Sequence, residues 1–313
     1  MQVKKLIGAL VAAGVLGAAG VASATPITFT FDPLGTGGAN GVGNLATIDQ
    51  SPGNSLAIGG VSGGSPALPV GTVIRNLYQA NLATMNDTDG EVAVSNTGPI
   101  RFTFVAGFDE RVISSSFDGV TATNSFQILS GGFFKMCAQA ANGNNLAGTG
   151  FACDDASTIL SGTILGGTGT QTGFVTNPVL FDQFGPDNHG GTLSVRSDGA
   201  ANVRMRIDFA DSNFFTDLLV GSALTVAFAN TSNITPFQQT NPSFLFSSDG
   251  IANGDVANNI GAINGISGPN FQFQADANSS FARIPEPMSL ALVGLALAGA
   301  GVATRRRQKA AAA

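Results

Sequence analysis

The chain has 313 residues, of which 42 are glycine and 11% are charged, and its formal net charge is −6 at pH 7. A chain that is 43% hydrophobic and poor in charge is not a disordered tail, because disorder goes with few apolar residues and a high net charge. The glycines follow no three-residue period, which excludes a collagen-like triple helix. The composition leaves a glycine-rich globular chain.

The first 24 residues have the three parts of an export signal. Lys4 and Lys5 precede an uncharged run from Leu6 to Val21, and the small residues Ala22 and Ala24 frame a cleavage site. A basic start, an apolar run and a small-x-small end are typical of secretory signal peptides. We predict a signal helix over residues 1–24 that is removed after Ala24. A buried helix or a permanent membrane anchor is the alternative.

Residues 25–283 are predicted to form one secreted, all-β domain with an antiparallel, β-sandwich-like architecture. Alternation of apolar with polar or small residues is typical of half-buried strands. The alternating segments are Ile27–Phe31, Arg101–Phe104, Val203–Phe209, Leu224–Phe228 and Phe271–Phe273. Turns are predicted at the Asp-Gly pairs 89–90, 118–119, 198–199 and 249–250, because these residues reach positive φ easily. The weakly patterned stretch Gly35–Gly71 is predicted to be a long loop.

This body is acidic, with 8 basic and 19 acidic residues and hence a net charge of −11. An acidic surface repels phosphate and anionic lipid headgroups, so we expect neither nucleic-acid binding nor electrostatic binding to a membrane. Solubility outside the cell and cation binding fit this charge better.

Asp87, Asp89 and Glu91 are weak candidate ligands for calcium, because they gather three carboxylates about one turn. Carboxylate oxygens are the ligands that Ca²⁺ prefers. An EF-hand aligned on Gly90 would need acidic residues where Met85 and Asn96 stand. A solvated Asp-Gly turn is therefore the favoured interpretation, and no cofactor is required.

Cys137 and Cys153 are the two cysteines of the chain. An even pair in an exported protein predicts a disulfide, which would stabilise the fold by roughly 3 kcal/mol for a loop of about 17 residues. The alternatives, a metal site or a catalytic thiol, lack a neighbouring histidine, since the single His189 lies 36 positions after Cys153.

A serine hydrolase has only slight support. The segment Gly60–Gly64 matches the G-x-S-x-G pattern around Ser62, but its flanks are loop-like rather than a strand and a helix. His189 stands in a turn-forming context. We predict that the protein is not an enzyme and name no catalytic residue.

The C-terminal segment 284–309 has three parts. Pro285-Glu286-Pro287 is followed by 17 uncharged residues, 288–304, and then by a basic cluster. The cluster contains Arg305, Arg306 and Arg307. A hydrophobic helix of this length is marginally long enough to span a bilayer, with its basic end on the cytoplasmic side.

In this order the three parts resemble the PEP-CTERM sorting signal of Gram-negative bacteria. The resemblance implies recognition by an exosortase, transient contact of the hydrophobic helix with the inner membrane, and delivery to the cell surface or the extracellular matrix. As with a GPI signal, the hydrophobic tail would be an address rather than a lasting span. An ordinary single-pass tail anchor remains the alternative.

Parts of the body are similar to the flocculation-associated branch of the PEP-CTERM proteins. The similar stretches are Asn76–Asn81, Phe104–Phe108, Phe228–Phe237 and Asn241–Ser243. The resemblance implies an exported protein that contributes without catalysis to exopolysaccharide-associated aggregation, as floc or biofilm. The alternative is a secreted Ca²⁺-dependent or polysaccharide-binding module.

Overall fold

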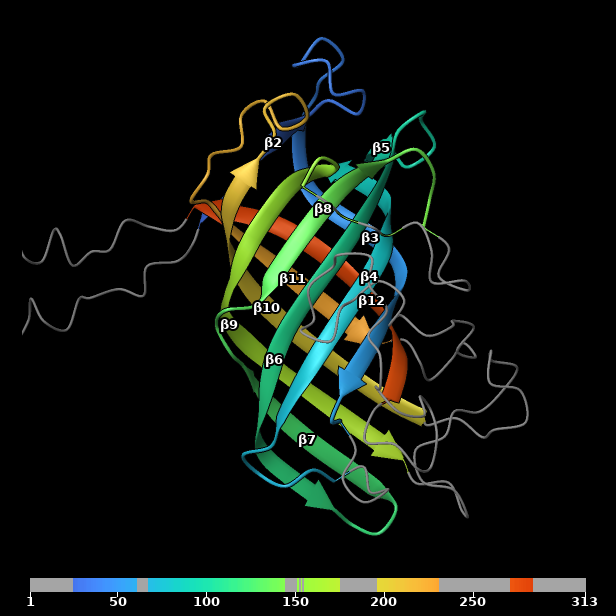
Figure 1. Cartoon of the computed structure of the whole chain (residues 1–313), viewed down its shortest axis with the longest axis vertical. Coiled ribbons are helices and arrows are strands. Elements are labelled where there is room, and N and C mark those ends of the chain that lie inside the picture. The colour runs from blue at the N-terminus through green and yellow to red at the C-terminus, as the bar shows by residue number, and fades with distance from the viewer. Residues whose placement is uncertain are drawn as a thin grey trace, which may run out of the picture. The chain divides into compact units, whose positions relative to one another are not determined.

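The computed structural model describes residues 25–60, 67–143, 151, 153, 155–174, 196–230 and 271–283. All regular secondary structure in these residues is β-strand, and the strand pairings given below are antiparallel (Figure 1). The prediction of an all-β, antiparallel fold is thereby confirmed. The sheet belongs to a compact unit, Pro26–Ala282. The predicted signal helix and C-terminal helix lie outside the described residues.

Twelve strands are found in the described part of the chain. They are β1 (Thr25–Pro26), β2 (Phe29–Phe31), β3 (Val42–Ile58), β4 (Val73–Asp87), β5 (Val92–Ser95), β6 (Arg101–Phe117), β7 (Thr121–Ile128), β8 (Phe133–Gln139), β9 (Thr158–Phe174), β10 (Arg196–Ala210), β11 (Ala223–Asn230) and β12 (Phe271–Arg283).

These strands form one sheet that closes on itself. The order β12-β11-β10-β9-β7-β6-β4-β3 returns to its start because β3 also pairs with β12. The closing ladder runs from Phe271 opposite Ala57 to Ser280 opposite Thr47. Figure 1 shows β10, β11 and β12 crossing behind β4, β6 and β8. Two walls thus face each other across a core, as the layers of a sandwich do, but here they are continuous.

β7 and β8 together occupy one strand position in the sheet, between β6 and β9. β6 pairs with β8 along its first half, from Arg101 to Gly107, and with β7 along its second half, from Glu110 to Phe117. On the other side, β9 likewise pairs with β8 along its first part and with β7 along its second part. Gly132 lies in the break between the two strands, where a Cβ atom would stand 2.4 Å from the carbonyl oxygen of Gly107. The close backbone approach therefore requires glycine at this position.

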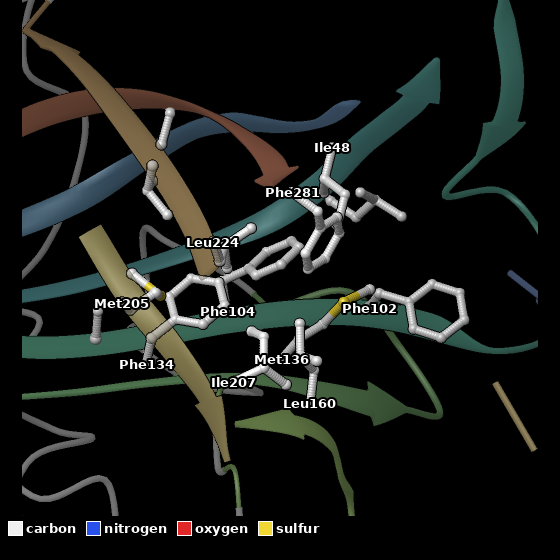
Figure 2. Packing of buried hydrophobic residues seen from close by; sticks show 14 of the residues in the cluster. Ile48, Phe102, Phe104, Phe134, Met136, Leu160, Met205, Ile207, Leu224 and Phe281 are labelled. Carbon is white, nitrogen blue, oxygen red and sulfur yellow. The ribbon is translucent and has the colours of Figure 1, made fainter. Parts of the chain in front are cut away.

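Inward-facing side chains from both walls fill the space between them. In β7, for example, the buried residues Ala122, Asn124, Phe126 and Ile128 alternate with more exposed neighbours. Figure 2 shows side chains from opposite walls meeting, with Phe104 and Phe134 close to Met205. The core has phenylalanine rings at one end, contributed by Phe29, Phe31, Phe102, Phe215 and Phe281.

Two sequence predictions are wrong. Much of the expected loop Gly35–Gly71 is β3, a strand of 17 residues. The expected turn at Asp198-Gly199 is part of β10, where both residues pair with β9. In both cases pairing with neighbouring strands outweighs the weak local pattern. The turns at 89–90 and 118–119 are present, and Gly90 and Gly119 have positive φ.

Candidate functional site

A cavity of about 80 Å³ lies between the two walls. None of the five phenylalanines at the end of the core described above lines it. Seven strands contribute to its lining: β3, β4, β6, β7, β9, β10 and β12. Its walls are largely apolar and include Ala57, Ile74, Phe108 and Phe126. Closure of the sheet is what brings these distant segments to one place. A concave, mostly apolar site with a few polar groups is the usual form of a small-ligand pocket.

Glu110 is the acidic residue among those that line the cavity. It occupies an inward position of β6, between Phe108 and Val112, and only 8% of it is exposed. Burial raises the pKa of its carboxyl group to about 7, although a hydrogen bond from the side chain of Asn76 opposes the shift. A carboxyl group in this environment changes its charge near neutral pH.

Gly169 of β9, two strands from β6 in the sheet, lies close to this carboxyl group. A Cβ atom at Gly169 of β9 would stand 3.3 Å from Oε1 of Glu110. Arg75 on the neighbouring strand β4 is paired with Asp109 at 2.7 Å, and Arg111, which follows Glu110, is exposed. Neither arginine lines the cavity.

Tyr78 also lines the cavity and is buried. Burial raises the pKa of its hydroxyl group well above the usual value, and the negative charges of Asp276 and Asp49 act in the same direction. The phenol therefore stays neutral over the physiological range. Tyr78 offers the cavity a polar but uncharged group.

A cavity with these groups is suited to holding a small ligand. Hydrolysis of a glycoside usually needs two carboxyl groups placed on either side of the bond. Among the described lining residues, Glu110 is the single carboxylic acid. Sequence reasoning missed this residue, although one signal was present: an acid at an inward position in the otherwise apolar series Ala106, Phe108, Glu110 and Val112.

The predicted disulfide is confirmed and joins Cys137 of β8 to Cys153. Both cysteines are buried on the outer face of the sheet with Leu77, Val105 and Phe151. The disulfide therefore holds a second, smaller apolar cluster against the outside of β4, β6 and β8. The arrangement is structural, and it lies on the other side of the sheet from the cavity.

The weak calcium candidates lie in a compact turn. Oδ1 of Asp87 accepts hydrogen bonds from the backbone N–H groups of Asp89 and Glu91, at 2.9 and 3.0 Å. One carboxylate oxygen is therefore used to close the turn. In the part of the chain that the structure describes, no three His, Cys, Asp or Glu residues are grouped so that they could hold a metal ion.

Asp32 organises a loop that the sequence did not single out. Its buried carboxylate accepts hydrogen bonds from the backbone N–H groups of Leu34, Thr36, Gly38 and Asn40 and from the hydroxyl of Thr36. Desolvation opposes its ionisation, but these hydrogen bonds outweigh that effect and lower its pKa to about 2. The carboxylate thus holds together the connection between β2 and β3.

We expect Asp32→Asn to lower the free energy of unfolding by about 2 kcal/mol at pH 7, because charged hydrogen bonds are the stronger ones and an amide offers only one acceptor oxygen. Urea unfolding followed by circular dichroism measures the loss. The contribution of Asp32 is present above pH 3.8 and is lost as the pH falls toward 2, so the two proteins should converge in acid. Asp155→Asn, at an exposed site, is the control, and an equal loss there would contradict the role of Asp32.

Other residues of interest lie outside the described part of the chain. They are the cleavage residues Ala22 and Ala24, the hydrolase candidates Ser62 and His189, and the sorting residues Pro285, Glu286, Pro287, Arg305, Arg306 and Arg307. Among the described residues, none belongs to a helix with the length and apolar character needed to cross a membrane.

Comparison of the chain with protein-family models, with curated proteins and with solved structures finds no match.

Proposed function

We propose that the protein is exported and acts at the cell surface or in the extracellular matrix of a Gram-negative bacterium. There it contributes without catalysis to exopolysaccharide-associated aggregation, as floc or biofilm. The observation that carries this proposal is the tripartite C-terminal segment: Pro285-Glu286-Pro287, an uncharged run and Arg305–Arg307. An exosortase would recognise this segment while its helix contacts the inner membrane.

Three further features support export. The first 24 residues have the pattern of a secretory signal. The disulfide between Cys137 and Cys153 suits an oxidising compartment outside the cytoplasm. The acidic body, with its net charge of −11, also favours solubility outside the cell.

An exposed polar surface on β7, β9 and β10 could meet a hydrated polymer. Thr168 of β9 lies between Gln127 of β7 and Asn202 of β10. Ser125 of β7 lies opposite Thr170 of β9. These side chains point away from the core, and most of them are exposed. Hydroxyl and amide groups held on a rigid sheet can exchange hydrogen bonds with the hydroxyl groups of a polysaccharide. We call this set of five residues the polar surface.

The first experiment is genetic. Cell aggregation and the location of the protein are compared in wild type, in a gene deletion and in a truncation that lacks Pro285–Ala313. We expect the deletion to disperse the cells while polysaccharide is still made, and the truncation to mislocalise the protein. Unchanged aggregation, with the tail still attached to the mature protein, would overturn the proposal.

The polar surface also favours the second candidate, a Ca²⁺-dependent or polysaccharide-binding module. Cosedimentation with purified matrix polysaccharide, with and without Ca²⁺, tests it. We expect the double variant Thr168→Val and Thr170→Val to bind at least threefold less polysaccharide, because it loses two exposed hydroxyl groups and keeps the side-chain shape. Thr97→Val, at an exposed turn, is the matched control. Equal binding by both variants would exclude the polar surface.

A further inference from the structure

The cavity holds an acid without a basic partner. The described residues that line it include Glu110 but no lysine, arginine or histidine. Asn76 donates a hydrogen bond to the carboxyl group, and this uncharged partner cannot balance a negative charge. A buried carboxylate is costly unless it is paired, so the site favours the arrival of a positive charge.

The basic residues whose side chains the structure describes do not fill this role. Residues 25–283 contain eight lysines and arginines, and six of them have described side chains. Arg75 pairs with Asp109, Arg206 pairs with Asp208, and Lys135 lies 3.5 Å from Asp155. Arg101 donates to the carbonyl oxygen of Asn96, and Arg111 and Arg204 are exposed.

The segments that join the strands beside the cavity cannot supply lysine or arginine either. Residues 61–66, 175–195 and 231–270 connect β3 to β4, β9 to β10, and β11 to β12. Their sequences contain neither residue type, and His189 is the single histidine among them. A positive charge beside Glu110 is therefore most simply brought by a ligand.

We propose that the cavity binds a small organic ammonium ion, with its charged nitrogen at the carboxylate of Glu110 and its short apolar body against Ile74, Phe108 and Phe126. The volume of about 80 Å³ restricts the part inside to a few heavy atoms. The site disfavours a hydrated inorganic cation, because Glu110 is the single charged oxygen ligand among the described lining residues. This inference rests on the cavity and is independent of the surface role proposed above.

Binding should depend on pH in a definite way. The groups that line the cavity with Glu110 include Ser55 of β3, Asn76 and Tyr78 of β4, Phe126 of β7 and Gly169 of β9. Of these, only Tyr78 can titrate, and it stays neutral. The empty site is half protonated near pH 7, whereas the ammonium ion needs the ionised carboxylate. Affinity for the ion should therefore rise about tenfold between pH 6 and pH 8.

The test uses the purified protein and two probes of equal length, n-butylammonium and n-butanol. Binding is followed by NMR of the ¹³C-labelled glutamate carboxyl groups. At pH 8 we expect n-butylammonium to bind at least tenfold more tightly than n-butanol and to shift the Glu110 signal. Glu110→Gln should abolish this preference, whereas Glu91→Gln, at an exposed turn, should retain it.

A second variant tests the place of binding. Ala201 lines the cavity from β10, and Ala201→Leu should fill the space and weaken both probes at least tenfold without removing the carboxyl group. Equal affinity of wild type for the two probes, undiminished amine binding by Glu110→Gln, or no binding of either probe would each overturn the proposal.

Discussion

Replacing Phe31 by alanine is expected to lower the free energy of unfolding by about 3–5 kcal/mol, the usual cost of removing a buried phenylalanine ring. Phe31 is fully buried. Its ring centroid lies 5.0 Å from that of Phe215 and 5.1 Å from that of Phe102. β2, β6 and the segment after β10 therefore meet at this one side chain, and its loss leaves a cavity that a rigid closed sheet fills poorly.

Urea unfolding monitored by circular dichroism at pH 7 measures this effect. Phe117→Ala is the matched control, because Phe117 is 46% exposed near the end of β6 and its removal should cost less than 1 kcal/mol. Similar losses for Phe31→Ala and Phe117→Ala would show that the phenylalanine end of the core does not carry the stability assigned to it.

Replacing Glu110 by glutamine should make the protein more stable at pH 8, by about 2–3 kcal/mol. The folded protein holds the carboxyl proton up to a pKa of about 7, whereas the unfolded chain releases it near the ordinary value of 4.5. The folded state therefore binds more protons between these values, and stability falls as the pH rises from 4.5 to 7. A difference of about 2.5 pKa units corresponds to about 3 kcal/mol.

Denaturant unfolding at several pH values measures this difference. Wild type and Glu110→Gln should be nearly equal at pH 4 and should diverge up to pH 7. Burial also raises the pKa of Asp49 and Asp276, but these residues are present in both proteins, so the comparison isolates Glu110. Glu91→Gln should follow wild type. Parallel curves for wild type and Glu110→Gln would contradict the assigned titration.

The candidate site shows why the sequence predicts only part of this structure. Alternation along β6 places Phe108 and Glu110 on one face, but a local pattern does not reveal what stands opposite. Gly169 follows Glu110 by 59 positions, and in the structure it lies close to the carboxyl group. Only closure of the sheet brings the two residues together.

The formation of β3 likewise depends on segments that are distant in the sequence. Its sequence around Gly53 is rich in glycine, serine and proline and carries little strand signal. It becomes a strand because β4 and β12 pair with it on its two edges. β12 begins more than 200 residues later, so this support cannot be seen in any local stretch of the chain.

The sequence by itself determined the features that depend on local chemistry. Alternating residues predicted antiparallel strands such as β10 and β11, and the even pair Cys137 and Cys153 predicted the disulfide. The tertiary structure decided the closure of the sheet through β3 and β12, the cavity, and the burial of Glu110. These features depend on contacts between distant segments, where backbone pairing and exclusion of water outweigh the preference of any single stretch.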